Sequence, residues 1–468
     1  MPQGAAAAPL TVAVVGSGPS GFYARPRCWT SKKYRSGWTC TSGWPRRGAW
    51  CVPESPPTIR RSRRCPACTA AIAAHENFRF FGNVDVGKDV TREELTARYD
   101  AVLYAVGAQT DRRLGIPGED LPGSVSAVDF VGWYNGHPDY AHLTFDLTGE
   151  RGVVIGAGNV ALDVARILCS PHERLSRTDI ADHALEALRA CALKEVLVVG
   201  RRGAAQAAFT TAELRELPEF TESGVDVDPA EVAEQEGEEG LSRLVKRNLA
   251  VMRGYAQNPV PAGARRVALR FQRTPLEIRG DGRVEEIVFA RNALKVGDDG
   301  WVSAVDTGER ETVPTSLVLR AVGYKGPVDR GAALRRPPRD HPEPERAGRG
   351  RRARVRRRLD EYVAGWIKRG PTGIIGTNKK CAGETVARLL ADVADGTLRR
   401  HDRGVAFDPV GEIDTWLRGR QPHLVTEQGW RLIDAAERSL GESAGRPRVK
   451  HVLTDELLDI ALERRIAS

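Results

Sequence analysis

Two glycine-rich turns, each spaced to bind a dinucleotide, stand about 140 residues apart in the chain. The first lies in VAVVGSGPSG (12–21) and the second in GVVIGAGNVALDVAR (152–166). The first small residue of this pattern permits a tight strand-to-helix turn, the second lets the backbone approach a pyrophosphate, and the third keeps helix and strand close. The residues at these positions are Gly16, Gly18 and Gly21 in the first turn and Gly156, Gly158 and Ala161 in the second.

The sequence around each turn favours nucleotide binding over an ordinary glycine turn. The apolar stretch VAVV precedes the first turn and the helix-compatible GFYA follows it, while VVI and ALDVARIL flank the second. Each following helix would direct free N–H groups at the phosphates. Two such motifs in one chain indicate two nucleotides held face to face, as in a flavoprotein that takes hydride from a pyridine nucleotide.

A pair of arginines indicates which pyridine nucleotide binds. Arg201 and Arg202 directly follow the apolar stretch VLVVG, where an NAD-binding unit would carry an acid for the ribose 2′-hydroxyl. Paired guanidiniums suit a 2′-phosphate instead. The alternative is a solvated basic turn. The sequence therefore predicts NADP rather than NAD.

The elements that must position these residues alternate between strands and helices. Buried strands are predicted within 99–109 and 194–203, helices at 179–190 and 209–220, and several further strands over 267–324. This alternation over 468 residues predicts an α/β fold with two Rossmann-like, doubly wound, three-layer nucleotide-binding domains.

The positive charge of the chain is confined to two patches. The formal charge is +9, yet residues 25–74 hold 11 Lys or Arg against one acid, and residues 330–358 hold 12 Arg against three acids. The remainder of the chain is therefore net acidic. Neither patch shows helical or strand periodicity, and the first also holds five of the eight cysteines and four of the nine tryptophans.

An amino-acid sequence that is rich in arginine, proline and tryptophan and lacks periodicity is typical of a GC-rich gene translated out of frame. Shifted by one base, permitted codons for residues 26–37 and 38–66 can encode TALLDIEEVPVR and VDVYERLAAPWGLVRAGVAPDHPKIPKVS. Residues 331–343, shifted the other way, can encode GLPFDDRRGTIPN. The first reading restores the strand VRVDVY followed by an acid, which a Rossmann unit needs. We hypothesise that residues 25–74 and 328–359 are frameshifted.

Two motifs in the patches offer binding alternatives. Cys65 and Cys68 form a CPAC pair, as in dithiol redox or zinc sites, and RGRRARVRRR (349–358) is typical of a module that binds nucleic acid or acidic lipid. No second cysteine pair or histidine cluster follows CPAC at ligand spacing. We therefore expect no metal site and no nucleic-acid partner.

The apolar stretches of the chain are short. None reaches the roughly 18 residues of a membrane span, so no membrane partner is expected. The N-terminal MPQGAAAAPLTVAVV lacks the basic region of a signal peptide and leads into the first glycine turn. The sequence thus predicts a cytoplasmic protein.

Eight segments together resemble the adrenodoxin-reductase-like ferredoxin–NADP+ reductases, in particular the actinobacterial type. They are GSGPSGFYA, YDAVLYAVGAQ, IPGEDLPG, DFVGWYN, GAGNVALDVARIL, VGRRG, AAFTTAELREL and GWIKRGPTGIIGTNKK. The resemblance covers most of residues 10–24, 76–326 and 360–455. The shifted readings add APWGLVRAGVAPDHPK and GTIPN, which also look like family segments.

The resemblance implies how the chain divides into domains. A discontinuous FAD domain would consist of residues 8–109 and 326–468, and the NADP domain would consist of residues 110–325. As given, the chain lacks both the family's histidine from the APDHPK stretch and the ribose-binding acid after the second strand, because that stretch is out of frame.

The resemblance also implies FAD and NADP as cofactors and a role for individual residues. The residues implied for FAD are Gly16, Gly18 and Ser20 at the pyrophosphate, Gly107 and Gly373 near the flavin, and Trp366 and Ile374 as further contacts. The residues implied for NADP are Gly158, Asn159 and Val160 at the pyrophosphate and Arg201, Arg202 and Glu213 around the 2′-phosphate. Glu216 would be catalytic, near the nicotinamide and the flavin, and its alternative is an exposed helix carboxylate.

The implied reaction passes hydride from NADPH to FAD and then single electrons to a ferredoxin, an iron–sulfur carrier, or runs in reverse. One alternative is another two-nucleotide flavoprotein, such as a glutamate-synthase-like electron-input subunit, although the cysteines here do not show the spacing of that subunit's N-terminal iron–sulfur clusters. Another is an inactive frameshifted product. We expect the chain as given to bind FAD poorly, because the first patch puts about ten net charges where a buried strand belongs.

Overall fold

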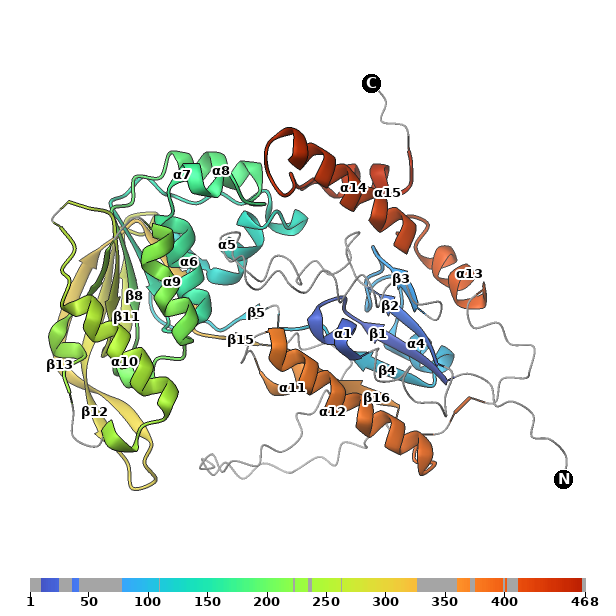
Figure 1. Cartoon of the computed structure of the whole chain (residues 1–468), viewed down its shortest axis with the longest axis horizontal. Coiled ribbons are helices and arrows are strands. Elements are labelled where there is room, and N and C mark those ends of the chain that lie inside the picture. The colour runs from blue at the N-terminus through green and yellow to red at the C-terminus, as the bar shows by residue number, and fades with distance from the viewer. Residues whose placement is uncertain are drawn as a thin grey trace, which may run out of the picture.

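The computed structural model describes two lobes, each built around a parallel sheet with helices (Figure 1). The described residues are 10–24, 36–41, 78–108, 110–221, 224–234, 238–261, 263–325, 360–370, 375–398, 400–401 and 411–464. The predicted site residues Gly373 and Ile374 lie outside this set, as do residues 328–359 and most of residues 25–74.

The first lobe contains a five-stranded sheet whose pairings are all parallel. Its strands, in spatial order, are β16 (Glu361–Val363), β4 (Ala101–Tyr104), β1 (Leu10–Val15), β2 (Ser36–Thr41) and β3 (Phe78–Phe81). Glu361 lies opposite Val102, so strands from the two ends of the chain share one sheet. The sheet of this lobe is therefore built from two separate stretches of the chain.

Helices cover both faces of this sheet, which explains why β1 is apolar at nearly every position. Val12 and Val14 pack toward α12 (Ile375–Ala394), beside α1 (Pro19–Ala24). Ala13 and Val15 belong to the opposite core, which includes residues of α4 (Arg92–Arg98) and α13 (Gly411–Arg420). The lobe therefore has the three layers that were predicted.

Strand β2 lies within residues 25–74, the basic patch in which the sequence shows no strand periodicity. It pairs with β1 from Leu10↔Ser36 to Val15↔Thr41, and its other edge pairs with β3. Backbone pairing between two parallel neighbours does not require side-chain alternation, so periodicity gave no signal here. The strand occupies the positions at which the shifted reading also places one.

The second lobe contains a six-stranded parallel sheet. Its strands, in spatial order, are β6 (Ser124–Ser126), β14 (Leu317–Arg320), β7 (Arg151–Ile155), β8 (Glu195–Val199), β10 (Arg266–Arg270) and β9 (Gly224–Val227). One face packs against helices that include α5 (Ala127–Tyr134), α6 (Asn159–Cys169), α8 (Asp182–Arg189), α9 (Thr211–Thr221) and α10 (Arg243–Ala256).

The third layer of the second lobe is an antiparallel sheet rather than helices. Its strands are β11 (Arg273–Arg279), β12 (Glu286–Val296) and β13 (Val302–Pro314). Apolar residues of this sheet, such as Ile287 and Phe289, share a core with Val153 and Val199 of the parallel sheet. The strands predicted over 267–324 are present, but only β10 and β14 join the parallel sheet.

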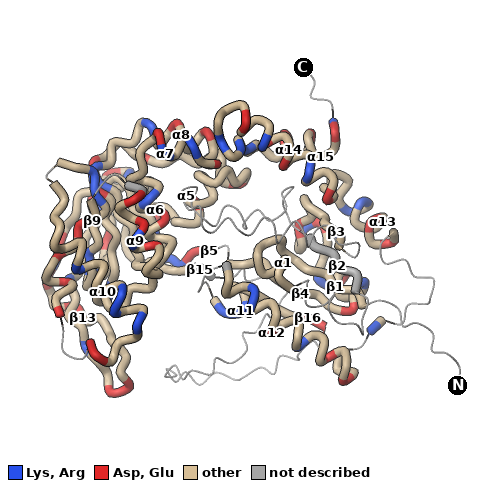
Figure 2. Tube along the Cα trace, viewed as in Figure 1, with Lys and Arg blue, Asp and Glu red and all other residues tan. Residues whose placement is uncertain are grey.

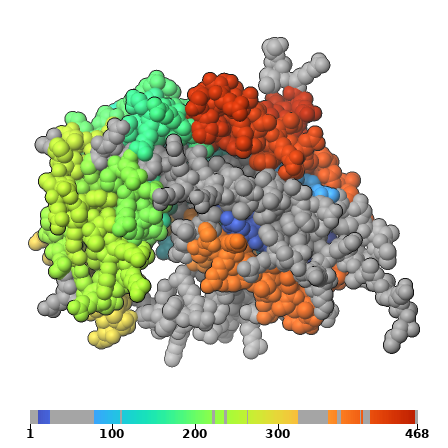
Figure 3. Space-filling model, in the orientation of Figure 1, coloured from blue at the N-terminus to red at the C-terminus, as the bar shows by residue number. Residues whose placement is uncertain are grey.

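Two short strands and the C-terminal helices connect the lobes. Strand β5 (Thr110–Asp111) pairs antiparallel with β15 (Tyr324–Lys325), where the chain passes between the lobes. Figure 3 shows the C-terminal helices, in red, beside the green second lobe. Helix α15 (Thr454–Ala461) packs against α14 (Glu427–Ser443), and between them Lys450 Nζ donates to the Asn135 carbonyl of the second lobe at 3.0 Å. No described helix is long and apolar enough to cross a membrane.

Candidate nucleotide sites

The first glycine turn has the geometry that a pyrophosphate requires. Gly16 has φ +103°, and a Cβ there would lie 2.6 Å from the Ala105 carbonyl oxygen. A Cβ on Gly21 would lie 2.4 Å from the Gly16 oxygen, so both positions exclude a side chain. A Cβ on Gly18 would meet no atom within 4 Å. The open space at Gly18 is where a phosphate can approach the backbone, so this turn fits FAD.

The C-terminal part of the chain packs directly onto this turn. The Ser20 hydroxyl donates a hydrogen bond to Asn378 Oδ1 at 3.0 Å, and both residues are buried. Gly365 has φ +82°, and a Cβ there would lie 2.1 Å from Ser20 Oγ. Trp366 follows as the first residue of α11 (Trp366–Arg369). The structure thus brings Ser20 and Trp366 into one region, as expected for a shared ligand.

Gly107 lies just beyond the carboxyl end of β4, at the same sheet edge as the first glycine turn. Its φ is +73°, and a Cβ there would meet no atom within 4 Å. Ligands of parallel sheets bind beyond the carboxyl ends of the strands. The position of Gly107 therefore agrees with a site for the flavin.

The second glycine turn repeats the geometry of the first. Gly156 has φ +135°, and a Cβ there would lie 2.3 Å from the Ala321 oxygen, whereas a Cβ on Gly158 would meet nothing within 4 Å. Gly158 is the N-cap of α6, so Asn159 and Val160 form the first turn of that helix. Asn159 Oδ1 accepts a hydrogen bond from the Thr210 N–H at 2.8 Å, which ties α6 to the segment before α9.

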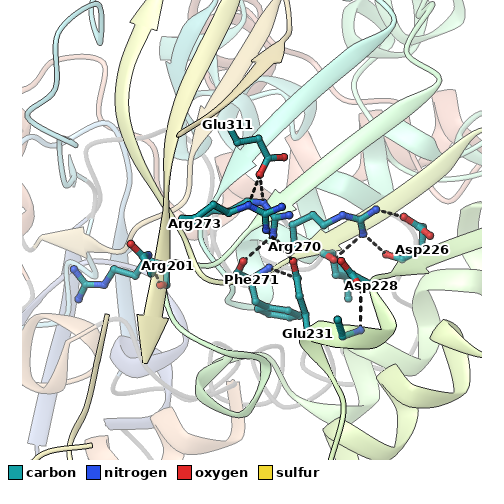
Figure 4. A network of polar contacts seen from close by, with 12 residues as sticks. Arg201, Asp226, Asp228, Glu231, Arg270, Phe271, Arg273 and Glu311 are labelled. Carbon is teal, nitrogen blue, oxygen red and sulfur yellow. Dashed lines mark hydrogen bonds and ion pairs between the residues drawn. The ribbon is translucent and has the colours of Figure 1, made fainter. Parts of the chain in front are cut away.

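Arg201 and Arg202 form an exposed cationic turn after β8. Arg201 is exposed and Arg202 half-buried. Burial and the neighbouring charge of Arg201 lower the pKa of Arg202. Within the described residues neither guanidinium forms an ion pair with a carboxylate. Figure 4 shows the Arg201 side chain pointing away from the ion pairs of Arg270 and Arg273, so Arg201 is open to an anion.

A buried charge cluster lies between α6 and α9. The fully buried Arg166 donates to Glu213 Oε2 at 3.0 Å and to Asp163 Oδ1 at 3.3 Å. Burial raises the pKa of Asp163 to about 8, assisted by the charges of Glu213 and Glu216 and opposed by Arg166. The structure thus groups the two predicted glutamates, but it pairs Glu213 with Arg166 rather than with the Arg201–Arg202 turn.

Sequence reasoning missed Asp163 and Arg166. Their signal was a pair of opposite charges, three residues apart, within the otherwise apolar helix ALDVARIL. On a helix this spacing places both on one side, and here that side faces α9. No group of metal-ligating residues occurs among the described residues.

Known proteins resemble this chain over nearly its whole length. An NADPH-ferredoxin reductase FprA of Mycobacterium tuberculosis is 46% identical over 464 residues, which cover 97% of this chain and 99% of the relative. The NADPH:adrenodoxin oxidoreductase of Arabidopsis thaliana mitochondria is 36% identical over 488 residues, covering 98% and 96%. A family model described as pyridine nucleotide-disulphide oxidoreductase matches residues 50–252.

Solved structures agree with these sequence matches. The structure of Mycobacterium tuberculosis FprA in complex with NADPH has a TM-score of 0.88 to this chain, at 46% identity, and the match covers 97% of this chain and all of that one. The α/β fold with two nucleotide-binding lobes is therefore that of these flavoproteins. The chain belongs to the family of NADPH-ferredoxin reductases that includes the mycobacterial FprA proteins.

Proposed function

We propose that this protein is a ferredoxin–NADP+ reductase that passes electrons between NADPH and a ferredoxin-type iron–sulfur protein through FAD. The observation that carries the proposal is the pair of glycine turns in a chain of this family. In each turn the second glycine leaves open space while the first excludes any side chain. Bound FAD supplies the conversion between the two-electron chemistry of NADPH and the one-electron chemistry of an iron–sulfur protein.

We assign FAD to the first lobe, residues 8–109 and 326–468. Gly16 and Gly18 would place backbone N–H groups against the pyrophosphate, and the Ser20–Asn378 hydrogen bond supports this by holding the turn. Gly107 and Trp366 would flank the flavin. Gly373 and Ile374 stay in the proposal on the resemblance alone.

We assign NADP to the second lobe, residues 110–325. The N-terminus of α6, at Gly158, Asn159 and Val160, would bind the pyrophosphate. Arg201 and Arg202 would bind the 2′-phosphate, which would supply the anion that their turn lacks. Both contacts orient the nucleotide, so that binding energy is spent on positioning the reacting ring.

The carboxylates between α6 and α9 would lie near the nicotinamide. Glu216 would hold or accept a proton there, and Asp163 would influence it because their charges interact. Glu213 would act indirectly, by holding Arg166 and thereby the angle between the two helices.

A cytoplasmic location belongs to the same proposal, and cell fractionation tests it.

The function is tested by mixing the flavin-loaded protein with NADPH and following flavin bleaching, and then by adding ferredoxin and following its reduction. We expect NADPH to bleach the flavin much faster than NADH, and ferredoxin to be reduced only when protein and NADPH are both present. Loaded protein that NADPH leaves oxidised would contradict the proposal. Reduction of the flavin without electron transfer to ferredoxin would contradict the proposed partner.

A further inference from the structure

The backbone of the Arg201–Arg202 turn is held by the antiparallel sheet. Asn292 Nδ2, from β12, donates to the Arg201 carbonyl oxygen at 2.8 Å. The Gln272 N–H donates to the Arg202 carbonyl oxygen at 3.0 Å, from a residue whose φ is +56°. The backbone of both arginines is therefore held by residues that follow them by 70 and 91 positions in the chain.

The antiparallel sheet is itself anchored by a buried ion-pair network, shown in Figure 4. Arg273, with a 3% exposed side chain, pairs with Glu231 and with Glu311 Oε2 at 2.9 Å. Its Nη1 also donates to the Phe271 carbonyl at 2.7 Å. Glu231 precedes β10 and Glu311 lies on β13. These contacts therefore hold the hairpin formed by β12 and β13 in one position relative to the parallel sheet.

Trp301 places an aromatic face beside Arg202. It immediately precedes β13, and its side chain is exposed by 61%. The Arg202 Cζ lies 5.0 Å from the Trp301 ring centroid, within the range of a cation–π contact. The Trp301 N–H donates to Asp299 Oδ1 at 2.9 Å, and its carbonyl accepts from the Gly297 N–H at 2.8 Å, so its backbone is held by the hairpin turn.

The contact with Trp301 can restrict the position of the Arg202 guanidinium. Its neighbour Arg201 repels it, and within the described part of the chain no carboxylate pairs with either residue. A long, unpaired guanidinium would otherwise sample many rotamers, which a ligand would have to restrict on binding. The negative face of the indole ring attracts the guanidinium and favours one position before the ligand arrives.

We propose that Trp301 is a positioning residue that holds the Arg202 guanidinium for the adenosine 2′-phosphate and so contributes to the preference for NADP over NAD. This inference rests on the proposed role of Arg201 and Arg202. It adds a specificity-determining residue from the antiparallel hairpin, outside both glycine turns and outside the VGRRG stretch.

The test is calorimetric titration of the full-length protein with NADP+ and with NAD+, which measures binding without requiring turnover. We expect Trp301→Ala to weaken NADP+ binding about two- to fivefold, as for an exposed cation–π contact, and to leave NAD+ binding unchanged. Trp301→Phe keeps an aromatic face and is expected to retain most of the affinity. Val305→Ala, another exposed apolar residue of the same hairpin, serves as the matched control and is expected to change neither.

A double-mutant cycle tests whether Trp301 affects NADP+ binding through Arg202. In an Arg202→Ala background, Trp301→Ala is expected to cause no further loss of NADP+ affinity, because the ring has no guanidinium to hold. Additive losses would overturn the inference. Equal weakening of NADP+ and NAD+ by Trp301→Ala would also overturn it, since the ring would then contact the adenosine directly.

The failure of this inference is distinguishable from the failure of the proposed 2′-phosphate site. If Arg202→Ala weakens NADP+ and Trp301→Ala does not, the arginine binds the phosphate without the ring, and only the role of Trp301 is wrong. If Arg201→Ala and Arg202→Ala both leave NADP+ affinity unchanged, the assignment of the arginine pair is wrong, and the role of Trp301 is overturned with it.

Discussion

The carboxyl group of Asp163 contributes to the pH dependence of the second lobe's stability. An ordinary aspartate has a pKa of about 4, whereas burial and the nearby glutamates raise the pKa of Asp163 to about 8. The folded state thus binds more protons than the unfolded chain between these two values. The stability that the protonated form contributes is complete below the unfolded pKa and is lost as the pH rises toward 8.

We predict that Asp163→Asn flattens this dependence. The amide cannot ionise, so the free energy of unfolding of the variant should fall less between pH 5 and 8 than that of the unaltered protein. Urea unfolding at several pH values measures the difference. Asp146→Asn is the control, because that carboxyl is more exposed and has a lowered pKa. Parallel pH profiles for Asp163→Asn and the unaltered protein would contradict the assignment.

At the scale of elements, the first and second glycines of each turn have different roles. The first is required by the backbone conformation, and the second leaves space for the ligand. Gly156 has a positive φ and no room for a Cβ, because the Ala321 carbonyl lies against it. Gly158 has φ −122° and open space. The same strand–turn–helix unit therefore contains one glycine required by the fold and another required by the ligand.

We predict opposite outcomes for alanine at these two positions. Gly156→Ala should lower the free energy of unfolding by at least about 1–2 kcal/mol, the cost of a left-handed conformation in a residue with a side chain. Gly158→Ala should leave stability nearly unchanged and weaken NADP+ binding severalfold, because its methyl group would occupy the phosphate space. Thermal unfolding and NADP+ titration of both variants provide the measurement. Equal NADP+ affinity for Gly158→Ala and the unaltered protein would refute the assignment of that space.

Elements that depend on local pattern could be predicted from the sequence, and those that depend on distant partners could not. The two strand–turn–helix units, the helix within 209–220 and the strand ending at Tyr104 follow from glycine spacing and apolar runs. The antiparallel layer was missed, because alternation along β11, β12 and β13 indicates strands without naming their partners. Strand β2 was missed because its pairing, rather than its side-chain pattern, defines it.

The same limit applies to the candidate sites. Gly16 and Gly158 could be selected from spacing alone, since the backbone geometry that they require is local. The arginine pair could be selected because it directly follows a predicted strand, although the contacts that hold its turn come from distant residues. Arg166 and Trp301 could not, because each acts across a contact between segments far apart in the chain. A charged residue in an apolar helix and a tryptophan in a polar hairpin were the signals available.

At the scale of the whole molecule, charge is distributed differently in the described residues and in the basic patches. Figure 2 shows acidic and basic residues interspersed along surface helices such as α8 and α14. Residues 25–74, which lie in the sequence between β1 and β3 of the first lobe, carry about ten net positive charges. Strand β2 (Ser36–Thr41) itself carries no charged residue, so these charges belong to the chain on either side of it. Each of them that folding of the lobe would bury unpaired costs several kcal/mol, against a whole domain's stability of about 5–15 kcal/mol.

We therefore predict that the chain as given retains less FAD than a chain that carries the two shifted readings. Both proteins would be purified in parallel, passed through gel filtration and compared by flavin absorbance per polypeptide, with NADP+ affinity as the control for the second lobe. Stoichiometric flavin in the chain as given would refute this prediction. Reading the coding DNA across residues 20–80 and 325–362 shows which chain the gene encodes.

The shared sheet of the first lobe sets an order of events during synthesis. Strands β6 to β14 leave the ribosome before β16 and α12, so the second lobe has all its sheet strands while the first still lacks an edge strand and a covering helix. Domains generally fold as units as the chain emerges. We expect the second lobe to fold during translation, and flavin capture to be a post-translational step that waits for the C-terminal third of the chain.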